Sequence, residues 1–122
     1  METILPVLLL GSLAVIVFDA IGSWASLRWK FPYPRLIIGS LMIYGTVGFL
    51  VARYTSPTLG GLVAGFVGLV DATAGWAVSW IIGPGRWPAE RVSVVRMLGT
   101  VLFVILTATT VGLAVGVMAT FL

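Results

Sequence analysis

Two aspartates lie inside long, apolar and otherwise uncharged segments, at matching places in the two halves of the chain. Asp19 opens the segment Asp-Ala-Ile-Gly-Ser-Trp-Ala, and Asp71 opens Asp-Ala-Thr-Ala-Gly-Trp-Ala, so both follow the pattern D-A-x-x-x-W-A. A carboxylate in hydrocarbon costs several kcal/mol unless it is paired, hydrated or protonated. The two acids are therefore the candidate functional groups of this sequence.

Three kinds of chemistry are open to these carboxyl groups. They can be protonated and donate hydrogen bonds between helices, since an apolar environment favours the neutral acid. One can pair with Arg96, which lies two turns inside its helix and within reach of Asp71 if that helix begins near Pro88. Finally, both can flank a hydrated cleft, share a proton and titrate as one unit, which would indicate transport of protons or cations.

Hydroxyl side chains follow each aspartate on the same helical face. Ser23 and Ser26 come at i+4 and i+7 from Asp19, and Ser79 shares the face of Asp71. Tyr44 and several threonines are further polar groups within the apolar segments. Most hydroxyls of apolar helices bond to their own backbone at i−4, and we expect this of most of these groups. The predicted intramembrane polar site comprises Asp19, Ser23, Asp71, Ser79 and Arg96.

The residue types argue against an enzyme. Cysteine and histidine are absent, which removes disulfides, thiolate nucleophiles, haem attachment motifs and the usual histidine-based metal and acid–base sites. The sequence contains no phosphate-binding glycine loop and no nucleophile with an evident base. We expect a non-enzymatic protein with no cofactor and no metal.

Composition predicts an integral membrane protein. The 122 residues are 60% hydrophobic and only 9% charged, whereas a soluble domain carries roughly 25% charged residues. A membrane span needs roughly 20 apolar residues, and four apolar segments occur at about 4–27, 36–52, 58–82 and 97–121. The start of the chain lacks the basic region of a signal peptide, so the first segment is interpreted as a retained helix. We predict a single all-α membrane domain over residues 1–122, a bundle of four transmembrane helices.

Basic and aromatic residues predict how the bundle is oriented. Six of the seven basic residues lie in or beside the first and third connections, namely Arg28, Lys30, Arg35, Arg86, Arg91 and Arg96. The positive-inside rule places loops 28–35 and 83–96 in the cytoplasm and both termini outside, with the plasma (inner) membrane as the expected location. The expected headgroup anchors on this side are Trp24, Trp29, Trp76, Trp80 and Trp87. The lipid bilayer is thus a predicted partner, and nucleic acid is not, because the positive charge is divided between two short loops.

The repeated motif predicts two tandem helix hairpins, about 1–54 and 58–122. Because each half contains two spans, the halves would be parallel repeats related by an axis along the membrane normal. Asp19 and Asp71 would then face that axis at a similar depth. Chance identity in a chain rich in alanine, glycine and tryptophan is the alternative explanation.

Small residues recur at every fourth position on the third and fourth predicted helices. These stripes are Gly60, Ala64, Gly68 and Ala72, followed by Ala108, Gly112 and Gly116. Small-xxx-small patterns allow helix backbones to approach closely in lipid. A contact between these two helices is the simplest use, and an oligomer or partner interface is the alternative.

Two functions are compatible with these features. The first is an accessory or structural subunit, working as a homo-oligomer or within a larger membrane complex, in which the acids hold helices together. The second is a minimal proton- or cation-coupled transporter or channel that uses Asp19 and Asp71. The position of the two carboxyl groups discriminates between them, since a transport site needs a cavity and a structural pair is sealed between helices.

Overall fold

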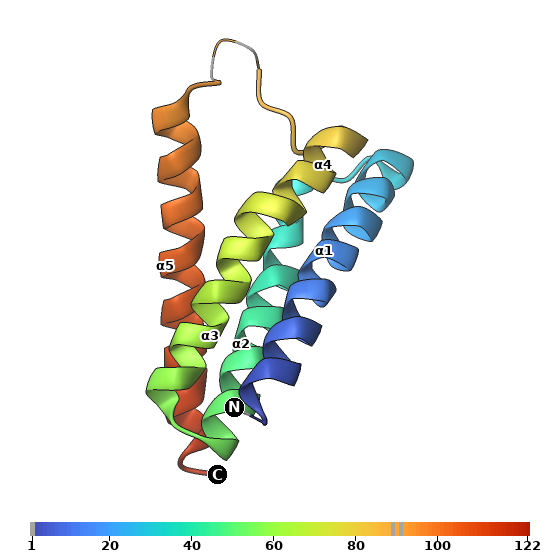
Figure 1. Ribbon diagram of the computed structural model, residues 1–122. Coiled ribbons are helices and arrows are strands. Elements are labelled where there is room, and N and C mark those ends of the chain that lie inside the picture. Colours follow the sequence, from blue (N-terminus) through green and yellow to red (C-terminus); the bar gives the residue numbers. More distant parts are fainter. Residues whose placement is uncertain (1, 89, 91) are drawn as a thin grey trace.

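Four long helices run through the part of the chain that the computed structural model describes, residues 2–88, 90 and 92–122 (Figure 1). They are α1 (Ile4–Trp29), α2 (Ile37–Tyr54), the continuous span Pro57–Ile82, and α5 (Val94–Ala119). Each is long and apolar enough to cross a membrane, which indicates a membrane protein. The described residues form no strand, so the predicted all-helical fold class is confirmed.

The third span is a helix of three parts. It consists of α3 (Pro57–Val70), a π-helical turn η2 (Asp71–Gly75), and α4 (Trp76–Ile82). It begins where the Ser56 hydroxyl accepts a hydrogen bond from the Leu59 N–H, with proline at the first helical position. It ends at Gly83, whose φ of 136° favours glycine. The π turn is the one irregularity along the described span, and it falls on the second motif.

The last helix begins later than a pairing of Arg96 with Asp71 would require. The Ser93 hydroxyl accepts a hydrogen bond from the Arg96 N–H at 3.1 Å and caps a helix that begins at Val94, not near Pro88. Arg96 therefore lies in the first turn of α5 instead of two turns inside it. Arg91, one of the basic residues used to orient the chain, lies outside the described residues.

Glycines bring α2, α3 and α5 into close contact. A Cβ added to Gly112 of α5 would overlap the Ala64 Cβ of α3 and lie 3.0 Å from the Gly60 carbonyl oxygen. A Cβ on Gly48 of α2 would lie 2.5 Å or less from backbone atoms of Gly112. The two stripes of small residues therefore lie at the α3–α5 contact, and α2 joins them there.

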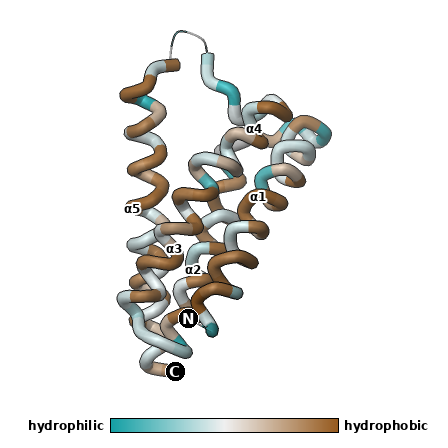
Figure 2. The backbone as a smooth tube through the Cα atoms, viewed as in Figure 1, coloured by the Kyte–Doolittle hydropathy of each residue, from teal (hydrophilic) through white to brown (hydrophobic). Residues whose placement is uncertain are grey.

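The two ends of the molecule differ in how its helices pack. Both termini lie at the same end as the α2–α3 connection, whereas α5 diverges from α1 and α4 toward the opposite end (Figure 1). Hydrophobic residues cover most of the length of the helices (Figure 2). The 3₁₀ turn η1 (Tyr33–Leu36) and the connection after α4 both lie at the diverging end. A pocket occupies the space where α5 separates.

Candidate functional site

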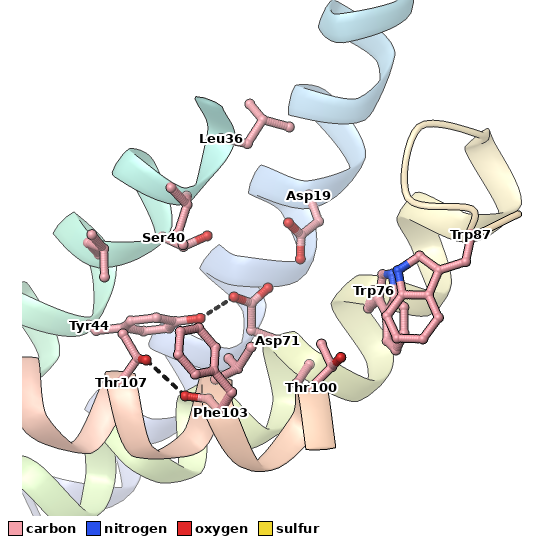
Figure 3. Close-up of a pocket in the computed structure, with 14 residues that line it drawn as sticks. Asp19, Leu36, Ser40, Tyr44, Asp71, Trp76, Trp87, Thr100, Phe103 and Thr107 are labelled. Carbon is pink, nitrogen blue, oxygen red and sulfur yellow. Dashed lines mark hydrogen bonds between the residues drawn. The ribbon is translucent and has the colours of Figure 1, made fainter. Parts of the chain in front are cut away.

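The two motif aspartates meet beside Gly75. Asp19 comes from α1 and Asp71 from η2, and their carboxyl groups point toward one another (Figure 3). A Cβ added to Gly75 would overlap the Asp19 Oδ2 atom and lie 2.9 Å from the Asp71 Oδ1 atom. Glycine at this position therefore leaves the space in which the two carboxyl groups converge.

Asp19 is buried without a complete set of hydrogen bonds. Its side chain is 5% exposed, and within the described part of the chain its Oδ2 atom has no hydrogen-bond donor. The neighbouring polar group is the Asp71 carboxyl. Two ionised carboxylates only accept hydrogen bonds. A hydrogen bond between these two groups therefore requires a proton on one of them.

Tyr44 of α2 is the third member of the site. Its hydroxyl donates a hydrogen bond to Asp71 Oδ2, and its side chain is 2% exposed. Tyr44 was not among the predicted site residues, although it is a phenol in the middle of an apolar segment, and that was the available signal in the sequence. Most threonines of the apolar segments behave as expected and bond to their own helix, as Thr46 does to the Met42 carbonyl at 2.8 Å. The Tyr44 hydroxyl instead meets a side chain on another helix.

The second motif lies in a π turn. Asp71 begins η2, whereas Asp19 lies in the regular helix α1. The Asp71 side chain contacts both Tyr44 of α2 and the Asp19 carboxyl of α1, and Ser79 contacts Ser23 of α1. Such turns occur frequently at functional sites, and the regular motif pattern gave no sign of this one.

Ser23 and Ser79 form a separate polar contact between α1 and α4. The Ser23 hydroxyl donates to the Ser79 hydroxyl at 2.8 Å, and both side chains are fully buried. Ser26 donates to the Phe31 carbonyl at 2.8 Å, beyond the end of α1. The predicted site residues Ser23 and Ser79 thus join α1 to α4, and neither lines the pocket that contains the aspartates.

The aspartates line a pocket of about 370 Å³ between α2 and α5. Its polar groups are Asp19, Asp71, Ser40, Tyr44, Thr100 and Thr107, and the rest of its wall is apolar or aromatic (Figure 3). The lining residues Ile37 and Phe103 are 51% and 63% exposed, so the pocket reaches the surface between these two helices.

Tryptophans from α4 and the following connection cover one end of the pocket. Trp76 and Trp87 both line it, with ring centroids 4.8 Å apart. The Trp76 indole N–H donates to the Gly85 carbonyl at 3.0 Å, which holds the connection against α4. Two of the five predicted headgroup anchors therefore belong to the wall of the pocket. Trp24 and Trp29 remain largely exposed on α1.

Arg96 lies away from the carboxyl pair. It is exposed in the first turn of α5 and lines a second pocket with Trp87, Thr100 and Phe103. The Asp71 carboxylate accepts from Tyr44 instead of pairing with this arginine. The structure thus brings Asp19 and Asp71 together and leaves Arg96 outside their contact.

The groups available for chemistry at this site are the carboxyl and hydroxyl oxygens that line the pocket. Among the described residues, no group of three acidic, histidine or cysteine side chains could hold a metal ion. The arrangement can hold a proton between two carboxyl groups, or a cation beside them in the pocket. Comparison of the chain with protein-family models, with curated proteins and with solved structures finds no match.

Proposed function

We propose that this chain is a small, non-enzymatic, multi-pass membrane protein that binds a proton or a cation at the Asp19–Asp71 pair. The observation that carries the proposal is the convergence of the two carboxyl groups at the wall of a pocket. Acids that only hold helices together would be sealed between them and fully hydrogen-bonded. Here Asp19 Oδ2 lacks a donor in the described part of the chain.

A single proton completes the hydrogen bonding of the pair. Two carboxyl groups in contact can share one proton, and that proton supplies the missing donor. A cation in the pocket can replace that proton, because it compensates the charge that the proton leaves behind. Exchange of one for the other is the elementary step of proton-coupled cation transport.

An accessory or structural subunit, alone as a homo-oligomer or in a larger complex, is the second candidate. Two interhelical hydrogen bonds favour it. Tyr44 joins α2 to Asp71, and Ser23 joins α1 to Ser79. In this role the acids are permanently neutral, and no ion exchanges with their proton.

Infrared spectroscopy separates the two candidates. A protonated carboxyl group in apolar surroundings gives its own C=O stretching band, and Asp19→Asn and Asp71→Asn assign that band. For the exchange site we expect the band of the purified protein to decrease as pH rises or as a cation is added. A band that responds to neither, while both variants stay folded, would establish the structural role.

We also propose how the bundle is oriented in the membrane and that it arose by duplication of a helix hairpin. The basic loops 28–35 and 83–96 face the cytoplasm of a plasma (inner) membrane and both termini lie outside. The chain has no cysteine, so single cysteines at Lys30, Thr55 and Arg86 can be labelled individually in intact cells. Labelling of the Thr55 position alone from outside is expected, and labelling of Thr55 and Lys30 from one side would refute the orientation.

The two motifs are proposed to derive from a duplicated helix hairpin, because each supplies one acid to the same pocket.

A further inference from the structure

We infer that the cation bound at the Asp19–Asp71 pair is an organic monocation with an apolar or aromatic body. The inference rests on the proposed function, since it names the class of ligand that the pair exchanges for its proton. Its basis is the chemistry of the pocket wall, which offers one concentrated negative site and a largely carbon surface around it.

The wall is poorly suited to a bare metal cation. Hard cations require a shell of six or more oxygen ligands arranged around the ion. Besides the two acids, the pocket offers the hydroxyls of Ser40, Tyr44, Thr100 and Thr107. These groups are spread over several helices, and the described residues contain no metal-ligating cluster.

Aromatic rings supply the complementary half of a site for an organic cation. The Trp76 and Trp87 rings lie 4.8 Å apart at one end of the pocket, and Phe103 lines its outer part. Aromatic faces attract ammonium groups through cation–π interactions and provide apolar contact for the remainder of the molecule. A volume of about 370 Å³ falls within the range typical of small-molecule pockets.

The surroundings of the pocket favour a lipophilic ion over a hydrated one. The second pocket, which shares Trp87, Thr100 and Phe103 with the first, also contains Arg96. A hydrated cation arriving from that end would meet the positive guanidinium group. The opening between Ile37 and Phe103 is apolar instead, and an organic cation with an apolar body can enter there from the lipid.

Isothermal titration calorimetry of the purified, full-length protein tests this inference. The probes are benzyltrimethylammonium, sodium, and the uncharged neopentylbenzene, which has nearly the same shape as the first. We expect benzyltrimethylammonium to bind and to release a proton, detected with a pH dye in weakly buffered solution. Asp19→Asn combined with Asp71→Asn should abolish that binding. Trp87→Leu should weaken it roughly tenfold, whereas Trp87→Tyr and the exposed control Trp29→Leu should keep it close to the wild-type value.

The outcomes separate the inference from the function on which it rests. Release of a proton by sodium but not by benzyltrimethylammonium would overturn the inference and leave the proposed exchange site standing. Equal binding of neopentylbenzene, or unchanged affinity in Trp87→Leu, would overturn it as well, because charge or aromatic contact would then be irrelevant. If no cation releases a proton from the folded wild-type protein, the proposed function fails together with the inference.

Discussion

Replacement of Gly112 by leucine tests the packing on which the site depends, because α5 is held against α2 and α3 at this residue. Even a Cβ there would overlap the Ala64 Cβ and lie 3.0 Å from the Gly60 oxygen. Overpacking of a tight contact costs about 1–3 kcal/mol and occasionally more. A whole leucine forces the helices apart, so we expect a loss of about 3 kcal/mol in the free energy of unfolding.

Gly99 provides the matched control, since it lies on the same helix and a Cβ there would meet nothing within 4 Å. Leucine is a better helix former than glycine by somewhat less than about 1 kcal/mol, so Gly99→Leu should leave stability unchanged or slightly raised. Unfolding of both variants by titration with sodium dodecyl sulfate in mixed micelles measures the difference, with Gly112→Ala as an intermediate step. Equal stability of Gly112→Leu and Gly99→Leu would show that the close α3–α5 contact does not form.

Three further predictions concern the polar groups. Tyr44→Phe keeps the ring but removes the donor to Asp71, and should lower the free energy of unfolding by about 1.5–3 kcal/mol if that carboxyl is ionised; an unchanged value would exclude an ionised acceptor. A double-mutant cycle of Ser23→Ala and Ser79→Ala should give a coupling energy of about 0.6 kcal/mol, and no more than about 1.7; zero coupling would contradict the buried hydrogen bond. Gly75→Ala should displace a flexible carboxyl group more than it disturbs the fold, so the infrared carboxyl band should shift while thermal stability changes little.

The long elements of the fold could be predicted because apolar length determines them. The four segments expected at about 4–27, 36–52, 58–82 and 97–121 correspond to the four long helices of the structure. The start near Pro88, which was the condition for a pairing of Arg96 with Asp71, was suggested because Pro88 and Glu90 resemble a helix start, and the helix begins at Val94 instead. Ser93 provides the cap that the chain uses, and a serine in a connection has many other possible roles.

The candidate site was only partly predictable, since it depends on how the helices rotate. The repeated pattern identified Asp19 and Asp71 but could not show that they meet. The hydrogen bond from Tyr44 and the position of Trp87 depend on how the helices are placed relative to one another. The spacing of residues along a single helix does not give that placement. Arg96 was chosen for its charge, and the later start of α5 removed it from reach.

The two copies of the motif place their acids on different kinds of backbone. Asp19 lies in a regular helix, whereas Asp71 begins a π turn. Both acids line the same pocket, but Asp19 is buried with one oxygen that has no donor in the described part of the chain, whereas Asp71 also accepts a hydrogen bond from Tyr44. If the pair exchanges a proton as proposed, the two acids are therefore not equivalent, because only Asp71 has a hydroxyl partner in the pocket wall.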